Sequence, residues 1–116
     1  MTFSISVEDS GTTRVAIAGH LDIVSVTELR PALEKVIAEK PARVEVDLSA
    51  LRMLDSSGVG ALVSLYKRAR AEGSRVEITG LRDQPLAIFR LLRLDGVLAG
   101  AVAKLPDEPK HPKSRG

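Results

Sequence analysis

The sequence predicts a single α/β domain with a mixed sheet of about five strands and three helices. Segments that alternate between apolar and polar residues, as half-buried strands do, interchange with segments whose apolar residues recur every three to four positions, as on one helix face. Right-handed crossovers between such elements give a partly parallel sheet. The 116 residues, 44% hydrophobic and 28% charged, are enough for one hydrophobic core.

The chain opens with two strands that are expected to pair as a hairpin. Residues 2–7 alternate between polar and apolar side chains, and the polar segment 8–11 with its glycine predicts a turn. Residues 14–18 are then the second strand, which ends at Gly19-His20-Leu21-Asp22.

A helix follows, because the next apolar residues have the spacing of one helix face: Val26, Leu29, Leu33, Val36 and Ile37. Ser25 with Glu28 three residues later fits a capping box at its start. Pro31 conflicts with this start, since proline has no backbone N–H and clashes with the preceding turn. Either the helix is kinked, or it begins nearer Glu28 with Pro31 in its first turn.

The second half of the chain continues the alternation of strands and helices. The predicted elements are a strand over residues 43–48, a short loop, a helix from 55 to about 72, a strand over 75–79, a helix over 85–94 and a last strand over 97–105. With only three helices, all of them can lie on one face of the sheet. The last strand is expected at an exposed edge, which leaves a weak homodimer open.

We assign residues 1–105 to the folded domain and residues 106–116 to a disordered tail. The tail has three prolines, two lysines and no apolar side chain, so it cannot contribute to a core.

Composition excludes several classes of site. Without cysteine there is no disulfide framework, thiolate zinc site or catalytic cysteine, and the two histidines, His20 and His111, are far apart in sequence. We therefore expect no metal and no cofactor. No apolar run approaches the roughly 20 residues that span a membrane, and no signal pattern opens the chain. We expect a cytoplasmic protein without membrane insertion.

The charge distribution argues against nucleic acid as a partner. The formal net charge is +2, with −3 in residues 1–60 and +5 in residues 61–116, and the basic residues are dispersed among apolar ones. Base stacking requires aromatic side chains, and the chain has three, Phe3, Tyr66 and Phe89. We expect charged, solvated faces rather than a binding surface for nucleic acid.

The segment from Asp55 to Gly60 is the most informative for function. It places the hydroxyls of Ser56 and Ser57 at the N-terminus of a helix, just beyond a strand, where ligands and partners of open α/β sheets commonly bind. A helix N-terminus offers unpaired N–H groups and tolerates an added phosphate. Gly58 and Gly60 leave room for a close approach of another backbone or a nucleotide.

Other interpretations of this segment remain open at this point. A serine at such a position is often only an N-cap, worth about 1 kcal/mol. The two glycines are a weak dinucleotide fingerprint because the third is missing. A serine nucleophile needs a neighbouring base, and His20, the one histidine of the folded domain, has no evident orienting group. We expect no enzymatic activity.

Two motifs together resemble the STAS domain family. Asp-Ser-Ser-Gly at residues 55–58, after a strand and opening an amphipathic helix, is similar to the family signature. Gly19-His20-Leu21-Asp22 resembles the family's Gly-x-Leu-Asp element. The resemblance covers roughly residues 3–105 and is strongest to free-standing bacterial anti-sigma-factor antagonists.

The resemblance implies a phosphorylation switch. In the family, the serine after that aspartate is phosphorylated by an anti-sigma factor that is also a serine kinase of the histidine-kinase-like ATPase fold. The unphosphorylated antagonist binds this partner and releases the sigma factor. Phosphorylation breaks the complex, and a phosphatase restores the unphosphorylated form that binds. Carried over, the acceptor is Ser56, with Ser57 as the neighbouring cap and alternative acceptor. The implied partner-binding residues are Asp22, Asp55, Ser56, Ser57, Gly58 and Gly60.

Two departures from the family pattern bear on the partner. His20 replaces a residue that is more often acidic or polar, and the proline-rich tail replaces a last helix. The main alternative is a STAS accessory subunit of a transporter, such as a lipid ABC transporter, that binds without phosphorylation. A nucleotide-binding protein or weak hydrolase using Gly58 and Gly60 is the third hypothesis.

Overall fold

The computed structural model describes residues 1–102 and has the α/β architecture that the sequence predicts. The tail over residues 106–116 and the domain boundary at 105 lie outside the described residues. The strands and helices, in chain order, are β1 (Thr2–Val7), β2 (Thr12–Leu21), α1 (Ile23–Ala38), β3 (Arg43–Asp47), β4 (Leu51–Leu54), α2 (Ser56–Ala71), β5 (Arg75–Thr79), α3 (Asp83–Leu91) and α4 (Leu94–Val97).

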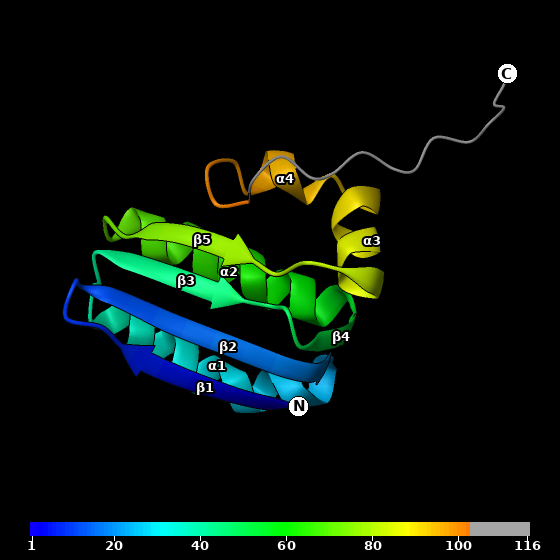
Figure 1. Ribbon diagram of the computed structural model, residues 1–116, viewed down its shortest axis with the longest axis horizontal. Coiled ribbons are helices and arrows are strands. Elements are labelled where there is room, and N and C mark those ends of the chain that lie inside the picture. The colour runs from blue at the N-terminus through cyan, green and yellow to red at the C-terminus, as the bar shows by residue number, and fades with distance from the viewer. Residues whose placement is uncertain (103–116) are drawn as a thin grey trace, which may run out of the picture.

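The sheet is mixed and has five strands, as expected. Its order is β1-β2-β3-β5, with β1 antiparallel to β2 and the other pairs parallel (Figure 1). Near its end β2 leaves β3 and pairs with β4 instead, through a register shift next to Gly19. Gly19 has φ +90°, which the left-handed region allows to glycine at little cost.

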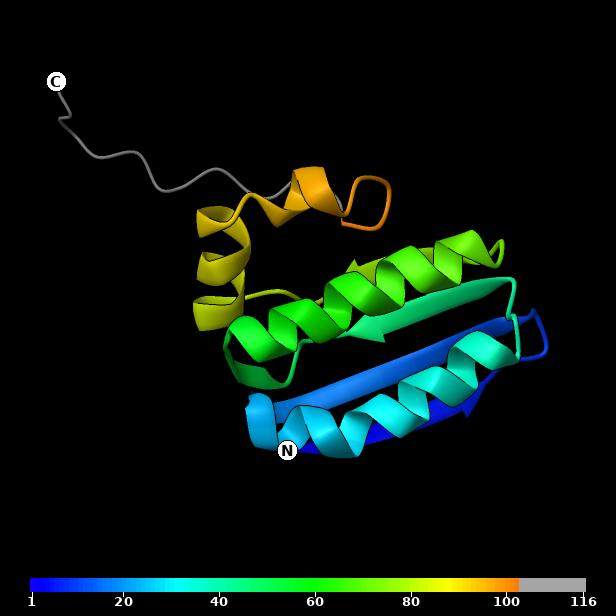
Figure 2. The ribbon, with the colours of Figure 1, turned by 180° about the vertical axis from the view of Figure 1, so that it is seen from behind.

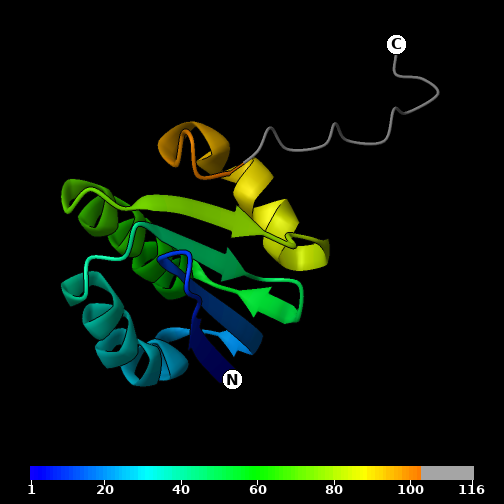
Figure 3. The same ribbon diagram turned by 60° about the vertical axis from the view of Figure 1, so that its left-hand side comes forward.

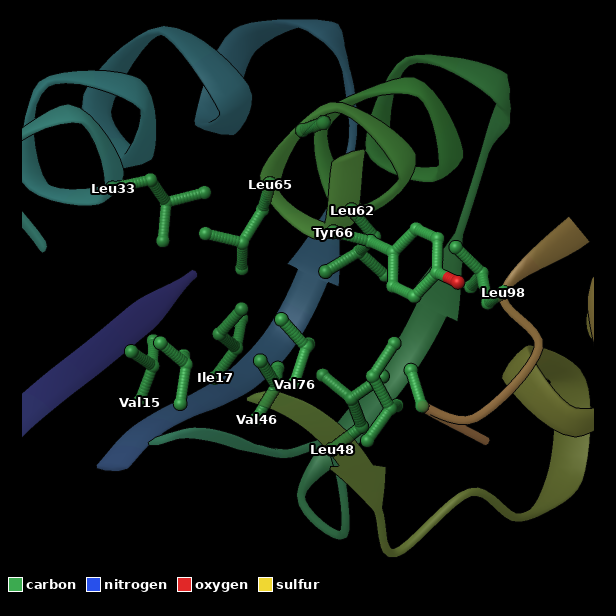
Figure 4. Close-up of a cluster of buried hydrophobic side chains, with 14 of the residues drawn as sticks. Val15, Ile17, Leu33, Val46, Leu48, Leu62, Leu65, Tyr66, Val76 and Leu98 are labelled. Carbon is green, nitrogen blue, oxygen red and sulfur yellow. The ribbon is translucent and has the colours of Figure 1, made fainter. Parts of the chain in front are cut away.

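The helices occupy two places around the sheet. α1 and α2 cover one face, whereas α3 and α4 lie at the end of the sheet and along β5 (Figures 2 and 3). Strand residues that point toward α1 and α2 are buried, among them Val15, Ile17 and Val46. They meet helix residues such as Leu33 and Leu62 in one hydrophobic core (Figure 4).

The face of the sheet away from α1 and α2 carries an ion-pair ladder. Arg14 pairs with Glu45 at 3.0 Å, and Arg43 pairs with Glu77 and, at 3.5 Å, with Glu45. Alternation along a strand puts these charged residues opposite the buried ones. This open face is therefore polar, while the apolar faces meet the helices.

The start of α1 decides between the two alternatives considered for Pro31, in favour of a helix that contains this proline. The helix begins at Ile23, with Asp22 as its N-cap, and Pro31 lies inside it. A capping box is present, but Ser25 is its N3 residue rather than its N-cap, so the predicted pairing of Ser25 with Glu28 is wrong. A start near Glu28 is also wrong.

Three other segments differ from the expectation. The short loop before Asp55 contains strand β4. The third helix spans Asp83–Leu91 rather than 85–94, and α4 follows it. The predicted strand over 97–105 is wrong for its described part: Val97 ends α4, and Val102 makes only isolated bridges to Ile78 and Ala99.

Candidate functional site

Two helix N-termini adjoin each other at the end of the sheet. β2 leads into α1 and β4 leads into α2, and Leu21 of β2 is the register partner of Leu54 of β4. The next residue in each case is a helix N-cap, Asp22 for α1 and Asp55 for α2. The Asp55 N–H donates to the Leu21 carbonyl over 3.2 Å. Strand pairing thus brings the two predicted aspartates to one place.

Asp22 caps α1 in a reciprocal arrangement with Ser25. Its Oδ1 accepts from the backbone N–H groups of Val24 at 3.0 Å and Ser25 at 2.9 Å, and its own N–H donates to Ser25 Oγ at 2.8 Å. Ser25 Oγ also donates to the His20 carbonyl at 2.9 Å. These hydrogen bonds, chiefly that from the Ser25 backbone, hold the pKa of Asp22 below its ordinary value.

This lowered pKa predicts how Asp22 contributes to stability. Because the pKa is lower in the folded state than in the unfolded chain, the contribution is present above the ordinary value of 3.8 and disappears as the pH falls through the folded-state value. We expect Asp22→Asn to lower the free energy of unfolding at pH 7, and the difference from the wild type to shrink below pH 3.8. Urea denaturation at pH 7 and at about pH 3 measures this; a difference of equal size at both would contradict it.

Within the described part of the chain, the Ser56 hydroxyl at the start of α2 has no hydrogen-bond partner. Asp55 Oδ1 accepts from the N–H groups of Ser57 at 2.9 Å and Gly58 at 3.1 Å, so an aspartate caps this helix. The interpretations of Ser56 or Ser57 as the cap are therefore wrong. Ser56 is exposed, is the first residue of α2, and its hydroxyl forms no hydrogen bond within residues 1–102.

The side chains of Asp55 and Ser56 should contribute differently to the free energy of unfolding. We expect Asp55→Ala to cost about 1 kcal/mol, as loss of an N-cap does, and Ser56→Ala to cost less than about 0.5 kcal/mol. Thermal or urea unfolding of the two variants beside the wild type measures both costs. A larger loss from Ser56→Ala than from Asp55→Ala would mean that the serine is the cap after all.

The later residues of this turn differ in exposure. Ser57 is half-buried, Gly58 is buried and Gly60 is exposed. A Cβ at Gly58 would lie 2.6 Å from Leu54 Cδ1 and 2.8 Å from the Leu21 carbonyl oxygen, whereas one at Gly60 would have nothing within 4 Å. Gly58 thus lets α2 pack on β2 and β4 and leaves no room for a ligand. Gly60 is the glycine at the surface, one helix turn beyond Ser56.

Exposed apolar side chains flank the two caps. Ile23 and Val24, in the first turn of α1, are 68% and 70% exposed, and Met53 of β4 is 45% exposed. Met53 is the register partner of His20, which is also exposed. The sequence does not point to Ile23, Val24 or Met53 as site residues, because the predicted helix begins after the first two and Met53 falls in a predicted loop. We call the following set the cap surface: Asp22, Ile23, Val24, Met53, Asp55, Ser56 and Gly60.

One side chain of α3 attaches that helix to the cap surface. Gln84 Oε1 accepts from the Leu54 N–H at 2.8 Å, and Gln84 Nε2 donates to the Leu54 carbonyl at 3.0 Å. Within the described chain β4 pairs only with β2, so the amide of Gln84 satisfies the other edge of the strand that precedes Asp55. No local pattern around Gln84 indicates this role.

The cap surface offers the chemistry of protein recognition. Apolar side chains next to fixed carboxylates and an unengaged hydroxyl suit a protein partner better than a small molecule, which needs a concave pocket. Among residues 1–102, no group of three or more His, Cys, Asp or Glu is placed to hold a metal ion. None of the helices in that range is long and apolar enough to cross a bilayer.

A comparison of the sequence with models of known protein families shows which family this chain belongs to. The family model described as "Mlab, STAS domain" matches residues 6–102. This chain belongs to the STAS domain family. The STAS domain includes both caps and all of the cap surface.

Three of the known proteins similar to this STAS domain are described as anti-sigma factor antagonists. The anti-sigma-B factor antagonist of Listeria monocytogenes is 28% identical, and the match covers 84% of each chain. The anti-sigma-F factor antagonist RsfB of Mycobacterium tuberculosis is 27% identical over 87% of this chain and 94% of its own. The crystal structure of an anti-sigma factor antagonist from Mycobacterium paratuberculosis has a TM-score of 0.76 and 26% identity, over 84% of this chain and 82% of that one.

Proposed function

We propose that this STAS domain is an anti-sigma-factor antagonist that is switched by phosphorylation of Ser56. In its unphosphorylated form it binds an anti-sigma factor that is also a serine kinase of the histidine-kinase-like ATPase fold, and so releases a sigma factor. The kinase transfers the γ-phosphoryl group of ATP to Ser56 Oγ, which loses its proton as ADP leaves. A phosphatase removes the phosphate, and the cycle takes place in the cytoplasm.

The main support for this proposal is that the Ser56 hydroxyl is exposed and has no structural role within the described residues. Its hydroxyl is exposed and forms no hydrogen bond within the described residues, because Asp55 caps the helix instead. A kinase therefore meets an acceptor that need not first be released from a structural role. The relatives named as anti-sigma factor antagonists support the same role.

The charges around Ser56 support its use as a switch. A phosphoserine adds about −1.5 to −2 charges at pH 7, next to the Asp55 carboxylate. In the free domain the positive end of α2 offsets part of this charge, so the fold should survive phosphorylation. In a docked complex the same charge would lose its water and face a surface that matched an uncharged hydroxyl.

The experiment that tests the proposal is capture of partners with two baits, Ser56→Ala and Ser56→Asp, from a lysate of the source cells. We expect the Ala bait to retain an ATPase of the histidine-kinase-like fold and the Asp bait to lose it, as read by mass spectrometry. The captured kinase should then phosphorylate the wild type and Ser57→Ala, but not Ser56→Ala.

The main alternative gives a different result in the same experiment. An accessory subunit of a transporter would capture a transporter ATPase with both baits, because its binding does not depend on phosphorylation. That outcome, or the failure of both baits to retain any ATPase, would overturn the switch.

A further inference from the structure

β1 is an unprotected edge of the sheet. It pairs with β2 and with no other strand among residues 1–102, and its outer side is open in Figure 1. All six residues of β1 are exposed. Natural edge strands usually carry lysine, proline or a bulge that prevents pairing with another chain, and Thr2–Val7 has none of these. At the opposite side of the sheet, the Ile78 N–H donates to the Ala101 carbonyl at 2.8 Å, so β5 is covered.

The backbone of β1 presents its free groups at three alternate residues. The Glu8 N–H donates to the Thr12 carbonyl at 2.8 Å, which makes these two a hydrogen-bonded pair of the β1–β2 ladder. Such pairs alternate with non-bonded ones in antiparallel sheets, so the even-numbered residues of β1 bond to β2. The N–H and C=O groups of Phe3, Ile5 and Val7 therefore point away from the sheet.

The same three residues carry the apolar side chains of the strand. Phe3 and Ile5 are opposite the buried residues Ile17 and Val15, so the row lies on the side of the sheet that α1 and α2 cover. The helices cover it incompletely: Phe3 and Ile5 are each 37% exposed and Val7 is 69% exposed. The edge thus combines free hydrogen-bonding groups with an apolar row.

We propose that β1 pairs antiparallel with β1 of a second copy of this chain, in a register centred on Ile5. Ile5 then faces Ile5 of the second copy, and Phe3 faces its Val7. In this register each outward N–H and C=O of the three residues finds a partner, and six hydrogen bonds form. The two apolar rows meet on one side and the hydroxyl-bearing residues of β1 meet on the other.

Self-complementarity is the reason to name a second copy as the occupant. The strand has no charged residue, so two copies approach without like-charge repulsion, and a charged segment would find no counter-charge there. A strand of six residues is about 20 Å long, and a single seam of that length covers less than the ~800 Å² per partner of a standard interface. We therefore expect a weak dimer that forms at high protein concentration.

Sedimentation velocity of the full chain between about 5 and 500 μM tests the dimer. We expect the average mass to rise with concentration from 12.4 kDa toward twice that value. Val7→Lys should raise the dissociation constant at least tenfold. Leu91→Lys, the matched control, changes a 76% exposed residue of α3 in the same way and should leave the constant unchanged. A wild type that stays monomeric throughout, or a Val7→Lys protein that dimerises like the wild type, would overturn the proposal.

Amide hydrogen exchange read by NMR tests the seam itself. Raising the concentration should slow exchange at Phe3, Ile5 and Val7, whose N–H groups point outward. It should leave Ser4 and Ser6 unchanged, because these already bond to β2. Slower exchange elsewhere without this alternation would mean that the copies meet through another surface, and the β1 seam would be wrong.

Discussion

Ser56→Asp should weaken binding of the anti-sigma partner by at least about 100-fold, whereas Ser56→Ala should change it by less than about twofold. A hundredfold loss corresponds to about 2.7 kcal/mol. We expect so large a loss of affinity because the new carboxylate would lose its water in the interface and lie next to Asp55. Asp22, the cap of the neighbouring helix, adds a further negative charge. Isothermal titration calorimetry with the purified partner measures both values, and high salt should reduce the loss only in part because the site is buried in the complex.

The matched control for this prediction is Ser57→Asp. It adds the same charge one residue later, at a half-buried position whose N–H is held by Asp55. Equal melting temperatures of the wild type and Ser56→Asp would show that the fold is unchanged. If Ser57→Asp abolished binding while Ser56→Asp did not, the assignment of Ser56 as the switch would be wrong.

The helices α1 and α2 show which parts of the fold could be predicted from the sequence and which could not. The extent of α2 followed from its apolar stripe, from the Asp-Ser-Ser-Gly segment and from Gly73, which stops it with φ +91°. The start of α1 did not follow, because Asp22 with Ser25 and Ser25 with Glu28 both have capping-box spacing. The choice between them depends on where β2 ends, and pairing with the distant strand β4 determines that.

The segment after Val97 is a second place where the structure could not be predicted from the sequence. The small apolar residues after Val97 suggested a strand, but side chains of α2 bind their backbone instead. Tyr66 OH donates to the Ala99 carbonyl at 2.7 Å, and Arg70 Nη1 donates to the same oxygen at 3.1 Å. Leu98 is fully buried. These contacts join residues about 30 positions apart, so no pattern in the local sequence indicates them.

The cap surface was only partly predictable for the same reason. Asp22, Asp55 and Ser56 could be named from two motifs, because each motif is local. Met53 could not, since its strand exists only through pairing with the end of β2. Partner specificity would depend on such exposed apolar residues, which differ from the motif residues in having no fixed spacing.

Gly58→Ala and Gly60→Ala should change stability in opposite directions, although they are the same substitution two residues apart in α2. At Gly58 the new methyl would meet the Leu21 carbonyl oxygen at 2.8 Å and Leu54 Cδ1 at 2.6 Å. Backbone cannot yield as a flexible side chain does, so we expect a loss of about 1–3 kcal/mol. At Gly60 the methyl meets nothing within 4 Å, and alanine should stabilise the helix by about 0.5–1 kcal/mol.

Urea denaturation of the two variants, with equal slopes of free energy against denaturant, gives both values. A stabilising Gly58→Ala would mean that α2 does not pack against β2 as closely as described. The same pair also separates structure from recognition, since Gly60 lies one turn from Ser56 on the surface. A stable Gly60→Ala that binds the anti-sigma partner more weakly would place Gly60 in the interface. Normal binding would place Gly60 outside the interface.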